Sequence, residues 1–317
     1  MTFAVSQLQA APHSIPLARL VKCLHILNEA DAQSRKNVSA DVIAQSVSFQ
    51  LSLTTLRVQD VLVIVTFFSR MVEGRGAKAQ DFSGPGTAGM EGQDKDGGRR
   101  EVLAALSVVV EGFCKTSRED AEALALAFGS CRYWDADGRL ARTLARYIGT
   151  ADDVDGWQGC DVNKACRIIS CLFQIGLQWN DARGAAGSWL AEMLATSVLI
   201  HARKRLELAQ DEACVAIWYM GLLGGGPTTG KSLKIATRPL EGNLCGLGVR
   251  QVSITLHGLA CMCSDQYDLV TRLMRRAAML EGAEWEADDI GRMCYASAVF
   301  VAVEAGARLG EAVSMCC

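Results

Sequence analysis

Apolar residues recur along this chain at helical spacing, in segments that each open with polar or acidic residues. In one of them Val162, Cys166, Ile169 and Phe173 stand at positions i, i+4, i+7 and i+11. Because an α-helix completes a turn every 3.6 residues, such a set forms an apolar stripe along one face of a helix. The pattern favours helix over strand and predicts helices that pack side by side through their stripes.

Six of these segments resemble one another in their polar start and their content of small apolar residues. They are Gln59–Met71, Glu119–Cys131, Cys160–Gly176, Asp211–Gly224, Arg250–Met262 and Asp288–Val303. From the second copy onward, equivalent positions lie 38 to 51 residues apart. A repeat of roughly 20–50 residues is typical of stacked-repeat proteins. We therefore expect an all-α fold, an α-solenoid of stacked helical hairpins in which each copy is the first helix of a hairpin.

The segments between the copies predict the second helices of the hairpins. These are Arg139–Ile148, Ala182–Leu208, Lys231–Thr237 and Tyr267–Leu280. The third is expected to stop before Pro239, because proline lacks the backbone donor that a helix interior needs. The last residues, Ala307–Cys317, are expected to form a truncated end cap. The acidic openers of the copies suit helix N-termini, where free backbone N–H groups favour negative charge.

Three parts are predicted along the chain. Residues 1–72 are expected to hold N-terminal helices and a first hairpin, with helices at Ile15–Asn28, Ala40–Leu51 and Val58–Met71. Residues 73–98 are rich in glycine and charge, and they predict a flexible insertion because they bury too little apolar surface to offset the entropy of ordering. Residues 99–317 are expected to form the repeat array as one continuous solenoid.

Composition limits the classes of protein that this chain can represent. It has 317 residues, of which 50% are hydrophobic, and a net charge of −3. No apolar run approaches the ~20 residues of a membrane helix, so no membrane partner is expected. The 13 cysteines are scattered without a CxxC pair and the histidines stand alone, which predicts no metal site. The cysteines within apolar stretches are interpreted as small buried residues of a reducing compartment.

The N-terminal segment is poor in acidic residues. Its first acid is Glu29, and Arg19 and Lys22 precede it among serines and apolar residues. A basic amphipathic start is typical of a mitochondrial or plastid import segment, and an ordinary first helix is the other interpretation. The mitochondrial matrix is therefore the expected location, with the cytoplasm as the alternative.

Two copies carry a resemblance to a known group of proteins. RQVSITLHGLACM, which starts at Arg250, and QDVLVIVTFFSRM, which starts at Gln59, resemble the first helices of octotricopeptide, FAST-kinase-like and RAP-type repeat proteins. The resemblance covers about Val58–Gly306 apart from the insertion. Members of these families bind organellar RNA or build organellar ribonucleoprotein particles. The resemblance implies that this chain is a non-catalytic scaffold of a mitoribosome or RNA-processing complex. Its expected partners are protein subunits and RNA, and no cofactor or small-molecule substrate is expected.

Basic residues gather on the predicted second helices. They are Arg139, Arg142, Arg146, Arg203, Lys204, Arg205, Lys231, Lys234, Arg238, Arg272, Arg275 and Arg276. If these helices stack side by side, the groups form a basic stripe along which an RNA backbone can lie. The other interpretation is a solvated helix face whose cations lie toward helix C-termini. The net charge of −3 argues against a general nucleic-acid binder and leaves a pure protein–protein interaction solenoid as the alternative.

One motif points to a different class of function. The sequence GGPTTGKS begins at Gly225 and fits the GxxxxGK[ST] pattern of a P-loop. There Gly225 and Gly230 would shape a phosphate cradle, Lys231 would contact the terminal phosphates and Ser232 the magnesium. A P-loop follows a buried strand, however, whereas the preceding Ala213–Leu223 predicts a helix. Nucleotide binding is the second alternative. No other catalytic motif is present, so no enzymatic activity is expected.

Overall fold

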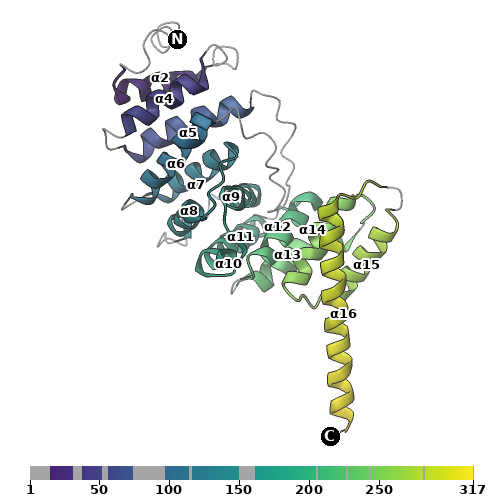
Figure 1. The fold of residues 1–317 in the computed structure, drawn as a ribbon. Coiled ribbons are helices and arrows are strands. Elements are labelled where there is room, and N and C mark those ends of the chain that lie inside the picture. Colours follow the sequence, from purple (N-terminus) through teal and green to yellow (C-terminus); the bar gives the residue numbers. More distant parts are fainter. Residues whose placement is uncertain are drawn as a thin grey trace. The chain divides into compact units, whose positions relative to one another are not determined.

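The computed structural model contains only α-helices as regular elements in the part of the chain that it describes, fourteen in all (Figure 1). The described residues are 15–30, 38–51, 56–73, 97–113, 116–149, 161–204, 206–225, 228–242, 244–280 and 283–316. The predicted all-α class is confirmed. Of the predicted insertion, residues 74–96 lie outside the described residues. Packing divides the chain into one unit of Met1–Ala151 with Ser170–Gln178, and another of Asp152–Ile169 with Trp179–Cys317.

The first unit arranges six helices in two layers. In chain order they are α2 (Leu17–Glu29), α4 (Ala40–Leu51), α5 (Val58–Glu73), α6 (Gly97–Glu111), α7 (Arg118–Ser130) and α8 (Arg139–Gly149). Helix α5 packs between α2 and α7 in one layer, and α6 packs between α4 and α8 in the other. Leu20, Leu24 and Leu27 of α2 are fully buried, so this N-terminal helix is part of the core.

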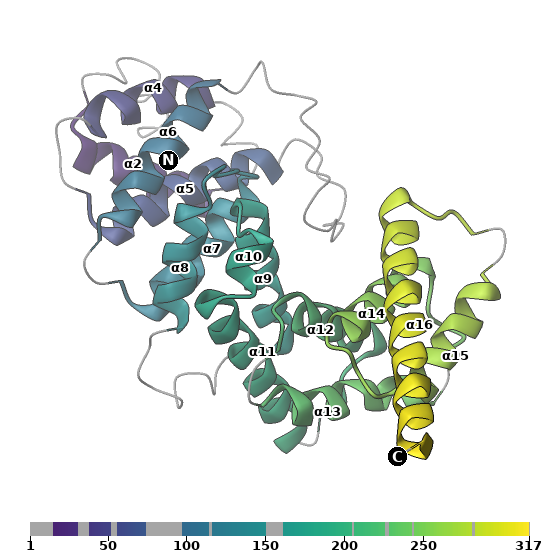
Figure 2. The same cartoon turned by 60° about the horizontal axis from the view of Figure 1, so that its bottom comes forward.

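The second unit repeats this arrangement (Figure 2). Its helices are α10 (Trp179–Ala182), α11 (Ala185–Arg203), α12 (Gln210–Leu222), α13 (Thr229–Glu241), α14 (Val249–Cys261), α15 (Tyr267–Ala278) and α16 (Ala287–Cys316), and α9 (Val162–Ile175) is shared between the units. Helix α14 packs between α12 and α16, while α13 packs on α11 and α12, and α15 on α14. The six repeat segments are thus the helices α5, α7, α9, α12, α14 and α16.

Two predicted helix ends in this unit are wrong. Helix α13 does not stop before Pro239 but runs on to Glu241. Pro239 stands in the last turn, where it removes a single backbone hydrogen bond, and Leu240 beyond it is fully buried. Helix α16 continues unbroken to Cys316, so Ala307–Cys317 is not a separate cap. Its glycines are isolated, and each costs only about 1 kcal/mol in a helix.

The long predicted helix over Ala182–Leu208 is also interrupted. Its first residue, Ala182, ends α10, and after a break at Arg183 and Gly184 helix α11 begins at Ala185 and ends at Arg203, short of the predicted Leu208. The break is tight, because a Cβ atom at Gly187 would collide with the carbonyl group of Ala182. A side chain at this position is excluded, and glycine permits the sharp approach of the two helices.

The polar openers of the first helices bond to one another across neighbouring helices. The bonds run from Gln59 Nε2 to Asp120 Oδ1 (2.7 Å), from Asn163 Nδ2 to Glu212 Oε1 (2.5 Å) and from Gln251 Nε2 to Asp211 Oδ1 (3.2 Å). Some openers also cap their own helix, since Glu212 accepts a bond from the backbone N–H of Ala209. The repeated polar start therefore aligns the N-terminal turns of neighbouring helices with one another. It also complements the dipole of each helix.

Two first helices, α12 and α14, approach each other closely at a pair of glycines. A Cβ atom on Gly258 of α14 would lie 2.6 Å from the carbonyl oxygen of Ile217 and 2.8 Å from Cα of Trp218, both on α12. A Cβ atom on Gly221 would meet the backbone of Gly258 in turn. These obstacles are backbone atoms, so no side chain can rotate away to make room. The two helices therefore touch backbone to backbone.

We expect Gly258→Ala to lower the free energy of unfolding by about 1–3 kcal/mol, because the added methyl group forces α12 and α14 apart. The matched control is Gly291→Ala in α16, where an added Cβ atom meets nothing within 4 Å. That change is expected to stabilise the protein by about 0.5–1 kcal/mol, since alanine favours helix over glycine. Urea unfolding followed by circular dichroism measures both, and equal effects would show that the close approach is unimportant.

Candidate functional site

The predicted basic residues are divided between the two units. Arg139, Arg142 and Arg146 lie on α8 of the first unit, and the remainder belong to the second, where Arg205 lies outside the described residues. On α8, Arg139 and Arg146 are exposed while Arg142 is half-buried. The opposite face of this helix is apolar and buried. Helix α8 therefore presents its arginines from the outer side of its layer, as the spacing predicted.

Helix α13 carries the most open of these basic faces. Lys231, Lys234 and Arg238 are all exposed, and no ion pair is found for them among the described residues. Since a helix rises 1.5 Å per residue, the three cations extend over roughly 10 Å of surface. Leu233 and Leu240 lie buried on the other side of the helix. Such a row can contact successive phosphates without any change in the fold.

Arg203 and Lys204 are exposed at the C-terminal end of α11. The backbone N–H of Lys204 donates to the carbonyl of Ile200, which closes the last turn of this helix. Cations at this end complement the partial negative charge of the helix terminus. The position of these two residues therefore agrees equally with a structural role and with an electrostatic contribution to a ligand surface.

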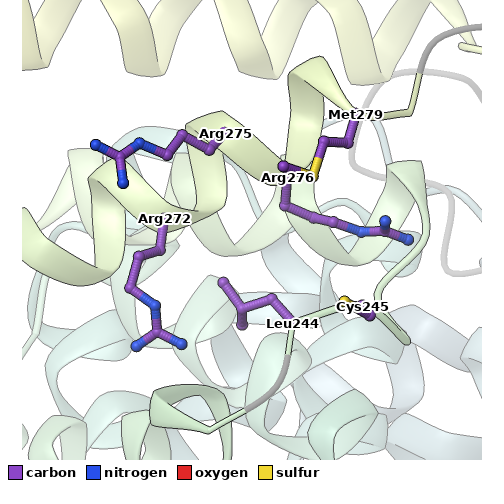
Figure 3. A pocket seen from close by; sticks show the side chains of 6 residues that line it. All are labelled: Leu244, Cys245, Arg272, Arg275, Arg276 and Met279. Carbon is purple, nitrogen blue, oxygen red and sulfur yellow. The ribbon is translucent and has the colours of Figure 1, made fainter.

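The arginines of α15 line a shallow cleft of about 210 Å³ beside the loop between α13 and α14. Its other lining residues are Leu244, Cys245 and Met279. Figure 3 shows Leu244 on the floor between Arg272 and Arg276, whose guanidinium groups diverge toward different parts of the neighbouring chain. Arg275 points away from both. The three positive groups thus surround the cleft without converging on one point inside it.

Hydrogen bonds explain this divergence. Arg272 Nη2 donates to the carbonyl oxygens of Gly242 at 2.8 Å and Leu240 at 3.4 Å. Arg276 donates from Nε and Nη2 to the carbonyl oxygen of Leu247, at 3.0 and 2.9 Å. These acceptors lie at the end of α13 and in the loop that follows it. Arg272 and Arg276 therefore brace α15 against that loop, and within α15 only Arg275 presents its charge entirely outward.

We expect Arg276→Ala to lower the free energy of unfolding by about 1.5–3 kcal/mol, the range for hydrogen bonds made by a charged group. Arg275→Ala removes the same side chain one position earlier, from an exposed site, and is expected to change stability by less than about 0.5 kcal/mol. Chemical denaturation of the two variants provides the comparison. Equal losses would contradict the bracing role of Arg276.

The GGPTTGKS segment does not have the geometry of a P-loop. It follows helix α12, not a strand, and its second and third residues lie outside the described residues. Ser232 is fully buried, and its hydroxyl donates to the carbonyl oxygen of Ala195 at 2.9 Å. Lys231 is exposed on the outer face of α13. The hydroxyl that a P-loop offers to magnesium is here used to join α13 to α11.

A buried polar network that the sequence did not indicate lies where α16 meets α14 and α12. Asp289 is only 4% exposed and accepts bonds from Ser253 Oγ of α14 at 2.5 Å and from Arg292 Nη1 at 2.9 Å. The guanidinium of Arg292 lies over the ring of Trp218, 5.4 Å from its centroid. The one sequence feature that could have indicated this network is the three-residue spacing between Asp289 and Arg292, which places both residues on one face of the helix.

A half-buried cysteine and histidine lie on the same face of α14. The Sγ atom of Cys261 is 3.9 Å from the ring nitrogens of His257, whose ring packs on Tyr295 with centroids 5.1 Å apart. Burial, and to a smaller extent the positive charges of Arg292 and Arg183, lower the pKa of His257 to about 4. Burial also raises the pKa of the Cys261 thiol.

These pKa directions decide what this pair can do. A nucleophilic cysteine needs a lowered thiol pKa and a base that can accept its proton. Here burial disfavours the thiolate of Cys261, and it also disfavours the protonated form of His257. The pair therefore lacks the lowered thiol pKa of an activated dyad, and the His257 ring packs α14 against Tyr295 of α16.

The other cysteines agree only in part with their interpretation as buried residues. Cys131, Cys166, Cys171 and Cys214 are buried, and burial raises the pKa of Cys214 to about 11. Cys294, which also lies in an apolar helical stretch, is exposed, so the interpretation is wrong there. Its helix, α16, has an apolar face that no neighbouring helix covers among the described residues.

The lowered pKa of His257 makes stability depend on pH. Between its ordinary pKa of about 6.5 and its folded value of about 4, the unfolded chain binds more protons than the folded one. The free energy of unfolding should therefore fall as pH decreases through this window, by about 1–2 kcal/mol after allowance for solvent screening. His257→Phe keeps a ring against Tyr295 and should remove this part of the loss. Urea titrations at several pH values test it, and identical pH dependence in both proteins would contradict it.

Comparison with known proteins adds no family to this description. No protein-family model matches the chain, and a search of curated proteins returned no match. Within the described residues, none of the helices combines the length and the apolarity that crossing a bilayer requires.

Proposed function

We propose that this chain is a non-catalytic α-solenoid that holds RNA and protein subunits within a mitochondrial ribonucleoprotein assembly. Each of its two units arranges consecutive helices in two layers, with the first helices of the repeats side by side. Stacked layers of this kind present an extended, preordered surface. The likeness of its first helices to octotricopeptide, FAST-kinase-like and RAP-type proteins supports the organellar setting.

The observation that carries the RNA component is the outer face of α13. Lys231, Lys234 and Arg238 stand exposed in a row on a helix whose opposite side is buried. Phosphate contacts dominate affinity for nucleic acids, and they require cations that are not already neutralised by neighbouring acids. Arg275 of α15 and the exposed end of α11 contribute further positive charge in the same unit. The net charge of −3 confines binding to such local faces.

The mechanism is passive positioning. The cations of α13 sit on a helix whose inner side is fixed by Leu233, Ala236 and Leu240 and by the Ser232 bond to Ala195. Little ordering of the protein is therefore needed on binding, which reduces its entropic cost. Aromatic side chains are scarce on this face, so the binding should depend on charge and shape and only weakly on base sequence.

A protein-only scaffold is the second candidate, and a specific observation favours it. Arg272 and Arg276, two of the predicted RNA-binding residues, are occupied by backbone carbonyl groups. Large apolar side chains are exposed elsewhere in the second unit, among them Met279, which is 73% exposed, and Val301, which is 67% exposed. Apolar exposure of this kind marks surfaces that other proteins cover.

Binding of single-stranded RNA at several salt concentrations tests the RNA component. We expect affinity to fall with salt, and Lys234→Ala with Arg238→Ala to reduce the slope of log affinity against log salt by about 1.4, or ~0.7 for each phosphate that is no longer neutralised. Arg19→Ala with Lys22→Ala removes the same charge from the exposed side of α2 and should leave that slope almost unchanged. Fluorescence anisotropy with a labelled oligonucleotide measures both.

If RNA does not bind even at low salt, the RNA component is wrong and the protein-only scaffold replaces it. If both double variants reduce the slope equally, the positive face of α13 has no special role, and binding follows total charge alone.

A further inference from the structure

The outer face of α16 is apolar. Ile290, Cys294, Ala298 and Val301 follow one another at spacings of four, four and three residues and are all exposed, Ile290 at 50% and Val301 at 67%. They form one stripe along the helix. Asp289 and Ala296 are buried on the opposite side, toward α14. The stripe therefore faces away from the layer to which α16 belongs.

Helix α16 is also longer than the helix on which it packs. It has 30 residues, whereas α14, on which it packs, has 13. At 1.5 Å per residue, α16 extends over about 45 Å. In Figure 1 its C-terminal part projects beyond α14 and α15. Because helices in proteins gain most of their stability from packing, a helix of this kind gains from a neighbour along its free side.

The corresponding helix of the first unit has a different outer face. Helix α2 stands at the edge of its layer, and its exposed side carries Arg19, Lys22 and Glu29. The exposed side of α2 is therefore charged around its one large exposed apolar residue, Ile26, whereas the described outer face of α16 is apolar. Charges on α2 oppose burial against an apolar helix, because they would lose their hydration. Head-to-tail docking of α2 on α16 is therefore disfavoured.

We propose that the stripe on α16 is a dimer interface, and that its occupant is α16 of a second copy of this chain. The stripe has no charge among its described residues, so it complements itself. A twofold pair uses the same patch on both chains and closes the assembly without leaving an open edge. An antiparallel pair that matches the two stripes would also place the two helix dipoles in opposite directions, which is the favourable arrangement.

This arrangement extends a mode of packing already present in the chain. Helices α12 and α14, and α14 and α16, lie side by side in one layer. A second α16 would occupy the next position in that layer, against the exposed stripe. The proposal rests on this continuity and on the charge of the two outer faces, and it is independent of RNA binding.

Sedimentation velocity of the full chain over a range of concentrations tests the proposal. The wild type is expected to shift from the 34.0 kDa of one chain toward twice that mass as concentration rises. Val301→Glu buries a charge in the pair and is expected to raise the dissociation constant by at least about 100-fold. The control is Val108→Glu on α6, a helical valine that is likewise 67% exposed, and it should leave the dimer intact. Circular dichroism verifies that each variant keeps its helical content.

Site-resolved alkylation provides a second measurement that needs no variant. Cys294 lies within the stripe and Cys245 lies in the loop beside α15, and both are exposed in the single chain. When nine-tenths of the chains are paired, labelling of Cys294 should slow by about tenfold while labelling of Cys245 does not. A monomeric wild type at every concentration overturns the proposal. So does a dimer that Val301→Glu leaves unchanged, or one that both glutamate variants disrupt equally.

Discussion

The contact between the backbones of α12 and α14 is the constraint on which the second unit depends. At Gly221 and Gly258 the two helices approach so closely that a single methyl group would separate them. This distance brings Trp218, Ser253 and the side chains around them into position for the packing of α16. A comparable close approach occurs in the first unit, where a Cβ atom on Gly129 would lie 2.5 Å from Cβ of Cys171. Small residues at these points set the spacing of the layer, and the large apolar residues fill the space that remains.

Because the distance between neighbouring helices is fixed, hydrogen bonds between small polar groups can set the register of one helix against the next. The bonds from Gln59 to Asp120 and from Gln251 to Asp211 lie at the N-terminal ends of neighbouring helices, where sliding of one helix by a turn would break them. Burial of apolar stripes tolerates such sliding, because one apolar residue can replace another in the contact. The polar ends therefore specify which turn faces which, while the apolar faces provide most of the stabilisation.

The sequence predicted the helical class and the repeat segments because apolar spacing can be read locally, without knowing which helix packs against which. The prediction failed where contacts between residues distant in sequence determine a helix end or the partner of a side chain. Burial of Leu240 against its neighbours extends α13 through Pro239, and no local signal shows that burial. The same holds for the basic residues. Spacing placed Arg272 and Arg276 on one side of α15, but it could not show that backbone carbonyls at the end of α13 and in the following loop would accept their hydrogen bonds. Lys231 and Lys234 lie on the outer face that helix periodicity predicts, and Arg238 joins them because α13 continues beyond its predicted end at Thr237.

The Asp289 network has a consequence for how this protein can change over generations. Asp289, Arg292 and Ser253 are joined in a site that water hardly reaches, so losing one partner leaves a charge or a polar atom stranded there. Stepwise replacement must then pass through a damaged intermediate, whereas simultaneous replacement by apolar residues need not. The residues that join α14 to α16 are accordingly expected to be substituted slowly in evolution and to change as a set. Exposed positions on the same helices are expected to change one at a time.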